Sequence, residues 1–260
     1  MIAGGFRLSV AARVEYGRAV ERARYQFVLG ATKPFDEVYP RSIFEKRVQR
    51  ELAEELALQK VFGLTVTPEL LAEEFDRIEK TTKAPEQWEA IKKALQSDRR
   101  LIEEVFCRPP LVERALWAKF AFDQTIHAGP HEKAREARAA FLAGKTVPGT
   151  TVVLLSRHGE AGPPVEEMLE KSKAEASLPP VLRPPEEPAK DRPVPLEPEM
   201  ARVLEKELTK PGDVTTILET RDRFDVFRLL TVTEESWKVE AVRVAKLDFD
   251  AWFEKARRAP

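Results

Sequence analysis

Apolar side chains recur at helical spacing through the first half of the chain. Phe44, Val48, Leu52 and Leu56 follow one another at four-residue intervals, an arrangement that lines one face of a helix. The same periodicity predicts further helices at Ala11–Leu29, after Thr67, from Pro85, after Asp98, around Leu116 and at His131–Leu142. Short helices with short connections indicate an orthogonal bundle rather than a coiled coil.

Prolines, glycines and small polar residues predict where these helices begin and end. Ser42 and Glu45 have the spacing of a capping box, and Gly63 is placed to end the same helix. Thr67 precedes a proline, a pair typical of a helix N-terminus because the first helical N–H needs no partner within the helix. The Pro109-Pro110 pair is expected to break or kink the chain.

The pattern changes after Thr146. Thr150–Leu155 is a run of β-branched and apolar residues, which predicts a strand. Residues 163–198 hold 10 of the 20 prolines, which predicts an extended loop over 177–198 and allows one short helix at Val165–Ala176.

Regular structure is predicted again from Pro198. Met200, Val203, Leu204 and Leu208 form a helical stripe. A turn, three strands and a last helix are predicted beyond it, at Lys210–Asp213, Val214–Glu219, Phe224–Thr231, Lys238–Leu247 and Asp248–Arg258.

This order of elements predicts a mainly α chain with a small α+β domain. Residues 1–145 are expected to form the helical domain, and residues 146–247 the α+β domain with its proline-rich loop at 177–198. Residues 248–260 are expected to hold the C-terminal helix. The length of 260 residues accommodates one large or two small domains.

Composition narrows the classes of function. The chain has 43 Lys and Arg against 44 Asp and Glu and a formal net charge of −1, which gives no sign of a basic nucleic-acid-binding domain. No stretch approaches the ~20 apolar residues that span a bilayer. Cys107 is the only cysteine, so neither an internal disulfide nor a cysteine-based zinc site can form. We therefore expect no nucleic-acid partner and no membrane span in this chain.

Common catalytic motifs are absent: the sequence has no GxGxxG, Walker, HExxH or GxSxG pattern. His127 and His131 are four residues apart, as a metal pair on one helix would be. Because Gly129-Pro130 lies between them and no third ligand is evident, two surface histidines are favoured. We expect no catalytic residue, metal or cofactor.

Two further candidates have a structural interpretation. Cys107 has only Arg108 beside it and no general base, so buried packing is favoured over a reactive thiol. Glu54-Glu55, Glu73-Glu74 and Glu103-Glu104 are adjacent on predicted helices, where neighbours point ~100° apart. These carboxylates are predicted to lie on solvated faces.

Large aromatic side chains are numerous for such short helices, and most are expected to form the core. They are Phe75, Trp88, Phe106, Trp117, Phe120, Phe122 and Trp252. A partly exposed patch of them would be a peptide-binding surface.

Four segments together resemble the SurA/PrsA group of parvulin-type prolyl isomerase chaperones. They are LSVAARVEYGRAVERAR (Leu8–Arg24), IFEKRVQRELAEELALQKVFGLTVTPELLAEEF (Ile43–Phe75), the region Asp98–Arg114 with F-x-R-P-x-L-V-x-R, and MARVLEKELTKPGDVTTILETRDRFDVFRLL (Met200–Leu230). The resemblance covers about half of the chain. It implies a SurA-like helical chaperone core, onto which the C-terminal helix packs back, plus one parvulin-like domain.

The isomerase site of that family is not matched here. Active parvulins carry a histidine on the first strand, and Thr151–Leu155 has none. A second family histidine corresponds to Asp225, and the proline-rich segment takes the place of the family's G-G-D-L-G loop. The resemblance therefore implies a degenerate isomerase pocket at Phe224, Asp225 and Phe227.

By this resemblance the chain is an ATP-independent chaperone of the periplasm or another exported location. It would hold unfolded or nascent exported polypeptides in a groove between the two domains. The candidate peptide-binding residues are Phe75, Trp88, Phe106, Trp117 and Phe120. The alternatives are an active prolyl isomerase that uses Asp225, Phe224 or Phe227, and a structural module for one dedicated partner.

The residues at the N-terminus give two expectations about an export signal. The N-terminus has no basic segment followed by an apolar one, so we predict no signal peptide within this chain. By the resemblance, Met1–Gly5 is expected to be the remainder of the family's opening strand, with an export signal or lipid anchor upstream.

Overall fold

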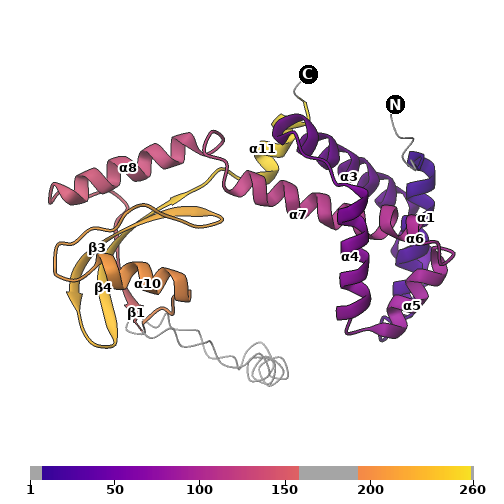
Figure 1. The fold of residues 1–260 in the computed structure, drawn as a ribbon, viewed down its shortest axis with the longest axis horizontal. Helices are drawn as coiled ribbons and strands as arrows, with labels where there is room; N and C mark the ends of the chain where they lie inside the picture. The colour runs from indigo at the N-terminus through magenta and orange to yellow at the C-terminus, as the bar shows by residue number, and fades with distance from the viewer. Residues whose placement is uncertain (1–7, 158–192, 259–260) are drawn as a thin grey trace. The chain divides into compact units, whose positions relative to one another are not determined.

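The computed structural model describes residues 8–157 and 193–258. The chain divides into two compact units, one built from the residues up to Phe122 and from Asp248 onward, the other from Asp123–Leu247. The first unit is helical, and the second holds a four-stranded antiparallel sheet with helices (Figure 1). The predicted mainly α chain with a small α+β part is therefore confirmed.

The first unit consists of short helices joined by short connections, as the periodicity predicts. They are α1 (Val10–Tyr25), α2 (Phe35–Val38), α3 (Arg41–Phe62), α4 (Pro68–Thr81), α5 (Pro85–Ala94), α6 (Arg99–Ile102), the π-helical turn η1 (Glu103–Cys107), α7 (Arg108–Ala121) and α11 (Phe249–Ala256). Helix α1 packs against α3 and α5, and α3 packs against α7.

Two of the predicted helix ends are confirmed. Gly63 ends α3 in the left-handed conformation, with φ at +66°, where glycine meets no steric penalty. Thr67 caps α4, since its hydroxyl oxygen accepts a hydrogen bond from the Leu70 N–H at 3.4 Å.

The predicted capping box at Ser42 is wrong. Helix α3 begins one residue earlier, at Arg41, and no side chain caps it. Pro40 precedes the helix in an extended conformation (φ −63°, ψ 150°) and so fixes the entry of the chain. Glu45 accepts from the Nε of Arg41 at 2.9 Å instead of from a backbone N–H.

The prediction of a break or kink at Pro109-Pro110 is wrong as to the break, because the helix continues through the pair. Helices α6, η1 and α7 follow one another without a gap from Arg99 to Ala121. The two prolines lie in the first turn of α7, directly after the π-helical turn. Because proline has no N–H to donate, a change of hydrogen-bond register just before the pair lets the helix continue.

A buried cluster lies between α1, α2 and α3. Val14, Phe35, Phe44 and Val48 form it, and Phe44 has no exposed surface. Leu56, the last member of the apolar stripe on α3, is 48% exposed. The stripe is therefore buried over its first part only.

The C-terminal helix α11 packs on α7 and α3. The Phe249 ring stacks on Trp117 with centroids 3.9 Å apart and meets Phe120 edge-on at 5.2 Å. Trp252 lies 4.9 Å from Phe120 and 6.0 Å from Phe62 of α3. Aromatic contacts thus attach the last helix to the first unit.

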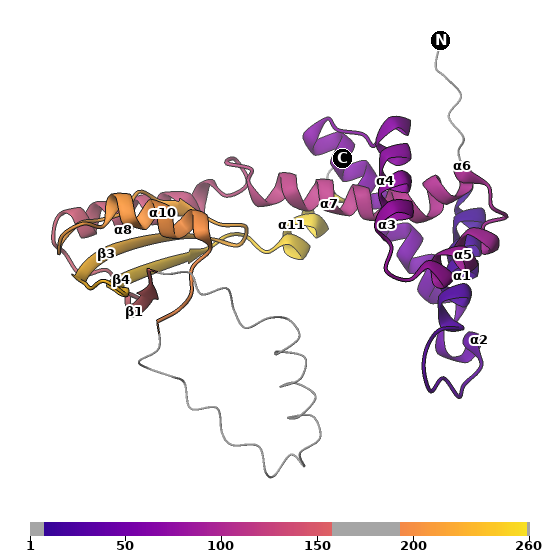
Figure 2. The same ribbon diagram turned by 60° about the horizontal axis from the view of Figure 1, so that its bottom comes forward.

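The second unit is a sheet with a helix on each face. Its elements are α8 (Ala128–Leu142), β1 (Thr151–Ser156), α10 (Pro198–Glu207), β2 (Leu218–Glu219), β3 (Arg223–Val232) and β4 (Ser236–Ala245). The strand order is β1-β4-β3-β2, and every neighbouring pair is antiparallel (Figure 2). The strands predicted from Thr150 and Phe224 onward are confirmed to within one or two residues.

Both faces of this sheet are buried. Phe227 and Leu229 of β3 pack with Leu204 of α10, and Phe224 packs on the other face with Phe141 of α8. Successive strand residues point to opposite faces. Apolar residues on successive positions of β3, such as Val226 and Phe227, therefore reach both buried faces.

Helix α8 belongs with the sheet. Ala134, Ala137 and Phe141 pack on it, and the two alanines let the helix lie close to the strands. The boundary between the units consequently falls after Phe122 rather than at residue 145, where the change of composition placed it.

The predicted turn before β2 is confirmed. The Asp213 carboxylate accepts from the backbone N–H groups of Thr209 and Lys210 at 2.9 and 2.8 Å, and these bonds lower its pKa. Gly212 has φ at +95°, a conformation that favours glycine.

Part of the sequence prediction lies outside the described residues: the helix at Val165–Ala176, loop residues 177–192 and the N-terminal Met1–Gly5. Near the end of the predicted loop, the Val194 N–H donates to the carbonyl of Leu154 at 2.8 Å. Val194 thus pairs with β1 a few residues before α10 begins.

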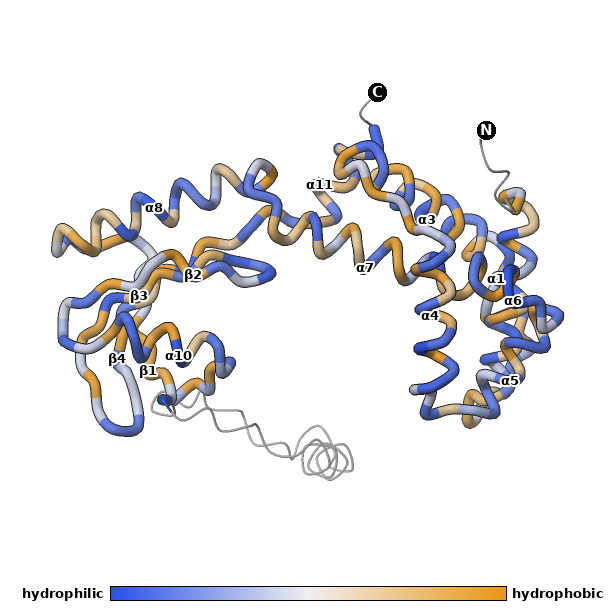
Figure 3. The backbone as a smooth tube through the Cα atoms, in the orientation of Figure 1, coloured by the Kyte–Doolittle hydropathy of each residue, from blue (hydrophilic) through white to orange (hydrophobic). Residues whose placement is uncertain are grey.

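Apolar and polar residues alternate at short intervals along the backbone (Figure 3). Across the described residues, no helix combines the length and hydrophobicity that crossing a membrane requires.

Replacing Phe249 by alanine should destabilise the first unit. Phe249 is 2% exposed and contacts Trp117, Phe120 and Trp252, so truncation leaves a cavity that costs about 3–5 kcal/mol of the free energy of unfolding. Urea unfolding measures the change. Leu29→Ala is the control, since Leu29 is 98% exposed, and its effect should stay within about 0.5 kcal/mol. Equal effects of the two variants would contradict this packing.

Candidate functional site

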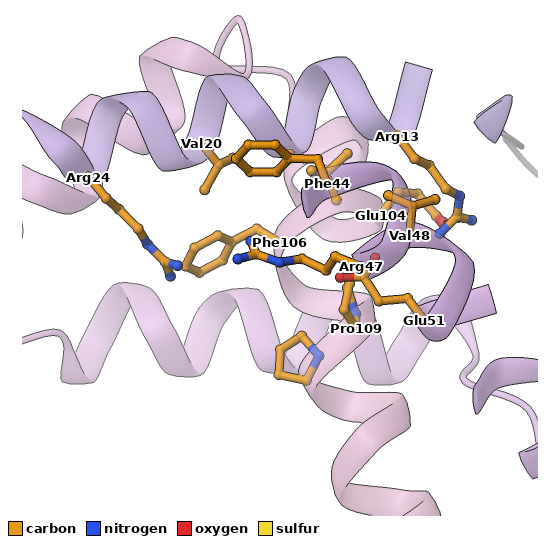
Figure 4. A pocket seen from close by; sticks show the side chains of 13 residues that line it. Arg13, Val20, Arg24, Phe44, Arg47, Val48, Glu51, Glu104, Phe106 and Pro109 are labelled. Atoms are coloured by element: carbon orange, nitrogen blue, oxygen red, sulfur yellow. Dashed lines mark ion pairs between the residues drawn. The ribbon is translucent and has the colours of Figure 1, made fainter. Parts of the chain in front are cut away.

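A pocket of about 260 Å³ opens within the first unit between α1, α3, η1 and the start of α7. It is lined by Arg13, Gly17, Val20, Arg24, Phe44, Arg47, Val48, Glu51, Glu104, Val105, Phe106, Pro109 and Pro110 (Figure 4). The lining combines apolar side chains with both signs of charge. This combination can hold an amphipathic group.

The apolar part of the pocket follows from helical spacing. Phe44 and Val48 are one turn apart on α3, and Val20 faces them from α1. The Phe106 ring of η1 completes this part next to the Arg24 guanidinium, whose central carbon lies 5.1 Å from the ring centroid (Figure 4).

In the described part of the chain, the ion pairs of three pocket arginines are long. Arg47 and Arg24 both approach Glu21, at 3.4 and 3.7 Å. Arg13 approaches Glu104 at 3.8 Å, and its buried Nε has no hydrogen-bond partner in the described part of the chain. These guanidinium groups retain unused hydrogen-bonding capacity.

Glu104 is held by another arginine. Its two carboxylate oxygens accept from the Nε and Nη2 of Arg108, both at 2.7 Å. Arg108 also pairs with Glu55 of α3 at 3.1 Å and donates to the carbonyl of Val66 at 3.3 Å. This fork geometry is the strong form of the arginine–carboxylate interaction. It explains why Arg13 is left with a long contact.

Glu51 is the titratable group of the pocket. Burial raises its pKa to about 7, against the lowering effect of Arg47 and Arg13, while Glu54 and Glu113 raise it further. The carboxyl group therefore changes its charge near neutral pH.

The stability of the protein should depend on Glu51 between about pH 4.5 and 7. With a raised pKa the folded state binds more protons than the unfolded state in that window, so the free energy of unfolding falls as the pH rises through it. Glu51→Gln should remove this fall and make the variant more stable at pH 8 by at most about 3 kcal/mol.

Urea unfolding at pH 5 and pH 8 checks this expectation. Glu37→Gln, an exposed position on α2, should follow the wild type. Parallel pH profiles for the wild type and Glu51→Gln would show that Glu51 is not the group responsible.

Three of the aromatic candidates form one cluster. The Trp88 ring lies 5.8 Å from Phe75 and 5.2 Å from Phe106. Trp88 is 5% exposed, and its Nε1 donates to Glu79. Trp88 is therefore a core residue, whereas Phe106 also lines the pocket.

The other two aromatic candidates lie at α11. Trp117 stacks on Phe249, and Phe120, which is 3% exposed, is enclosed by Phe249 and Trp252. The structure therefore separates the five predicted residues into two clusters. Phe106 is the member that lines the pocket.

The predicted isomerase residues do not converge on one pocket. Phe224 and Phe227 are both 2% exposed and belong to the cores on opposite faces of the sheet. Asp225 is 1% exposed, and the Arg223 Nε donates to both of its oxygens at 3.0 Å. Arg243 approaches it at 4.0 Å. Burial raises the pKa of Asp225 despite these arginines.

The Asp225 carboxylate should contribute to stability. Asp225→Ala removes charged hydrogen bonds and should lower the free energy of unfolding by about 1.5–3 kcal/mol. Asp222→Ala is the matched control, because Asp222 is 72% exposed and its ion pair with Arg223 is expected to contribute about 1 kcal/mol or less. Thermal unfolding monitored by circular dichroism gives both values. Similar losses in the two variants would contradict the buried role of Asp225.

The prediction of two surface histidines is wrong for His127. This side chain is 1% exposed, and its Nδ1 accepts from the Leu247 N–H at 3.3 Å. His131 is exposed, and helix α8 includes Gly129-Pro130 in its first turn instead of starting after the pair. Within the two described stretches, no group of three or more His, Cys, Asp or Glu side chains is placed to hold a metal ion.

The buried role predicted for Cys107 is confirmed. The thiol has no exposed surface, and burial raises its pKa to about 12, so it is not a thiolate at neutral pH. The solvated faces predicted for the glutamate pairs are only partly correct. Glu54 and Glu74 are each 6% exposed and pair with arginines, Glu54 with Arg50 at 2.8 Å and Glu74 with Arg114 at 2.9 Å.

A second, wider hollow of about 510 Å³ lies on the second unit beside α8. His131, Leu142 and Ile217 contribute to its lining. Arg138 also lines it, but its Nε already donates to the Thr215 carbonyl at 2.8 Å. It offers less unused hydrogen-bonding capacity than the pocket of the first unit.

The charged residues of the pocket were missed from the sequence. Arg13, Gly17, Val20 and Arg24 recur every three or four residues and share one face of α1. That spacing could have identified this face of α1 from the sequence. It does not reveal which partner helix the face meets.

Comparison with known proteins gives no match: no family model, no curated protein and no solved structure matches this chain. The resemblance to the SurA/PrsA group thus stands on the four sequence segments. A function has to be inferred from the pocket and the fold.

Proposed function

We propose that the chain is an ATP-independent, SurA-like chaperone that binds segments of unfolded polypeptides. The observation that carries this proposal is the pocket in the helical unit, where an apolar lining that includes Phe106 and Phe44 meets arginines with unused donors. An unfolded chain offers both apolar side chains and charged or backbone acceptors. Such a pocket can bind many sequences.

The energetics favour weak and reversible binding. Apolar surface removed from water contributes about 25 cal/mol per Å², and the ordering of the client chain offsets much of this. Because binding in a small pocket is weak, clients bind and dissociate without an energy-consuming cycle. The absence of a Walker motif from the sequence agrees with a mechanism that needs no nucleotide.

We infer that the two units are a SurA-like helical core and a degenerate parvulin-like domain. The packing of α11 on α7 supports the first assignment, because the resemblance implies a C-terminal helix that returns to the core. The second rests on β1, α10 and the β2–β3 hairpin, which occur in the order that the resemblance implies. Exported polypeptides as clients and a periplasmic or other exported location belong to the same proposal.

Loss of isomerase activity is also part of the proposal. Two features support it: Asp225 is buried in an ion pair with Arg223, and Phe224 and Phe227 lie on opposite faces of the sheet. Isomerisation requires one pocket that desolvates and twists a prolyl amide against a barrier of ~20 kcal/mol. These three residues do not surround such a pocket.

Suppression of aggregation tests the chaperone activity. A chemically denatured protein diluted into buffer without nucleotide should scatter less light when the chain is present at a near-stoichiometric ratio. Phe106→Ala should weaken this suppression, because it removes an aromatic wall of the pocket. Phe27→Ala is the matched control, since Phe27 is 41% exposed and does not line the pocket.

Folding of the variants is checked by circular dichroism, because Phe106 also contacts Trp88. Phe106→Leu, which keeps an apolar side chain, should retain more of the suppression than Phe106→Ala. No suppression with any of several clients would contradict the general chaperone. A stable complex of fixed stoichiometry with one protein would favour the dedicated-partner alternative.

A further inference from the structure

We propose that the pocket binds the C-terminal residue of an unfolded polypeptide, with its carboxylate on the pocket arginines and its apolar side chain on Phe106, Pro109 and Pro110. This inference rests on the proposed function, since it names the part of the client that the pocket selects. Three separate observations support it: the unused donors of the arginines, the size of the pocket and the placement of its charges.

The first argument is the state of the arginines. The ion pairs of Arg13, Arg24 and Arg47 measure 3.8, 3.7 and 3.4 Å, whereas both contacts of Arg108 to Glu104 measure 2.7 Å. Guanidinium groups prefer planar, paired oxygen acceptors, and a carboxylate supplies them. The pocket therefore has donors arranged around it for one more carboxylate.

The second argument is size. A volume of about 260 Å³ is below the ~300–1,000 Å³ of pockets that enclose drug-sized ligands. It suits a single residue rather than a length of chain. A C-terminal residue carries a carboxylate and a side chain on the same Cα atom, so one residue can satisfy both kinds of lining.

The third argument is the arrangement of the lining. Arg13 is the deep arginine, with 12% of its side chain exposed, while Arg24 and Arg47 are 41% and 45% exposed. In Figure 4, Phe44 and Val48 lie between Arg24 at one end and Arg13 at the other. Arg24 and Arg47 share Glu21 as their partner, whereas Arg13 approaches Glu104, so a ligand carboxylate meets either the Arg24 and Arg47 pair or Arg13.

Of the two glutamates that line the pocket, Glu51 opposes an anionic ligand and Glu104 does not. Glu104 is engaged by Arg108 through both oxygens. Among the described residues Glu51 makes no short ion pair, and its carboxyl group is the one that a ligand carboxylate would approach. Removing the charge of Glu51 should consequently strengthen binding of an anionic ligand.

Three fluorescent peptides of one sequence test the proposal. The first ends in phenylalanine with a free carboxylate, the second ends in the same phenylalanine as an amide, and the third has an amidated end with an internal glutamate next to phenylalanine. Fluorescence anisotropy with the full chain at pH 8 gives their affinities. The free acid should bind about tenfold tighter than either of the others, or more.

Variants of the full chain locate the carboxylate. One of the variants Arg13→Gln and Arg47→Gln should reduce the affinity for the free acid to that for the amide and leave the amide unchanged, and this variant identifies the arginine that holds the carboxylate; no loss in either variant would overturn the assignment. Arg41→Gln is the matched control, because Arg41 lies on the same helix as Arg47 but outside the pocket. Glu51→Gln should strengthen binding of the free acid alone. Circular dichroism checks the fold, and Arg13→Lys, which keeps the charge, should retain part of the preference.

The outcomes separate the two proposals. Equal binding of free acid and amide would overturn the carboxylate assignment and leave peptide binding in place. Binding of the internal-glutamate peptide as tight as that of the free acid would overturn the choice of a chain end. Absence of binding by all three peptides would overturn this inference, and suppression of aggregation in the same preparation would show that the proposed chaperone function survives without it.

Discussion

The partly buried ion pairs of Arg108 with Glu104 and Glu55 are the interaction on which the helical unit depends. It joins η1 to α3, and through the Val66 carbonyl it also reaches the segment before α4. With 13% of its side chain exposed, Arg108 needs all of these acceptors, since a buried charge without partners is strongly destabilising. By engaging both oxygens of Glu104, it also leaves Arg13 with unused donors.

The π-helical turn η1 links this ion pair to the pocket. Glu104, Phe106 and Cys107 all belong to it, yet they serve different surroundings. Glu104 meets Arg108, Phe106 lies between Arg24 and Trp88, and Cys107 is buried. The π-helical turn before Pro109-Pro110 places these side chains in different directions around the helix axis. The helix continues through the turn. The site thus depends on a local irregularity rather than on the regular part of the fold.

Periodicity and capping residues predicted most of the helices and strands, as the end of α3 at Gly63 and the start of α4 at Thr67 illustrate, but they missed α2 and gave a wrong cap for α3. They could not predict which segments meet. His127 is buried because the chain returns beside it at Leu247, 120 residues later. The pocket likewise combines α1 with α3 and η1, and a helical pattern identifies the face of one helix but not its partner.

The unused donors of Arg13 connect stability with binding. A buried donor left without a partner costs about 1–3 kcal/mol, a cost that the free protein carries at the Nε of this arginine. A ligand that supplies the acceptor recovers that free energy on binding, whereas apolar surface alone cannot. Among ligands of similar shape, the pocket would then favour one that carries an acceptor, because a ligand without an acceptor leaves the Nε of Arg13 unpaired. Under the proposal, the same imperfect pairing that weakens the folded state would supply the chemical preference of the pocket.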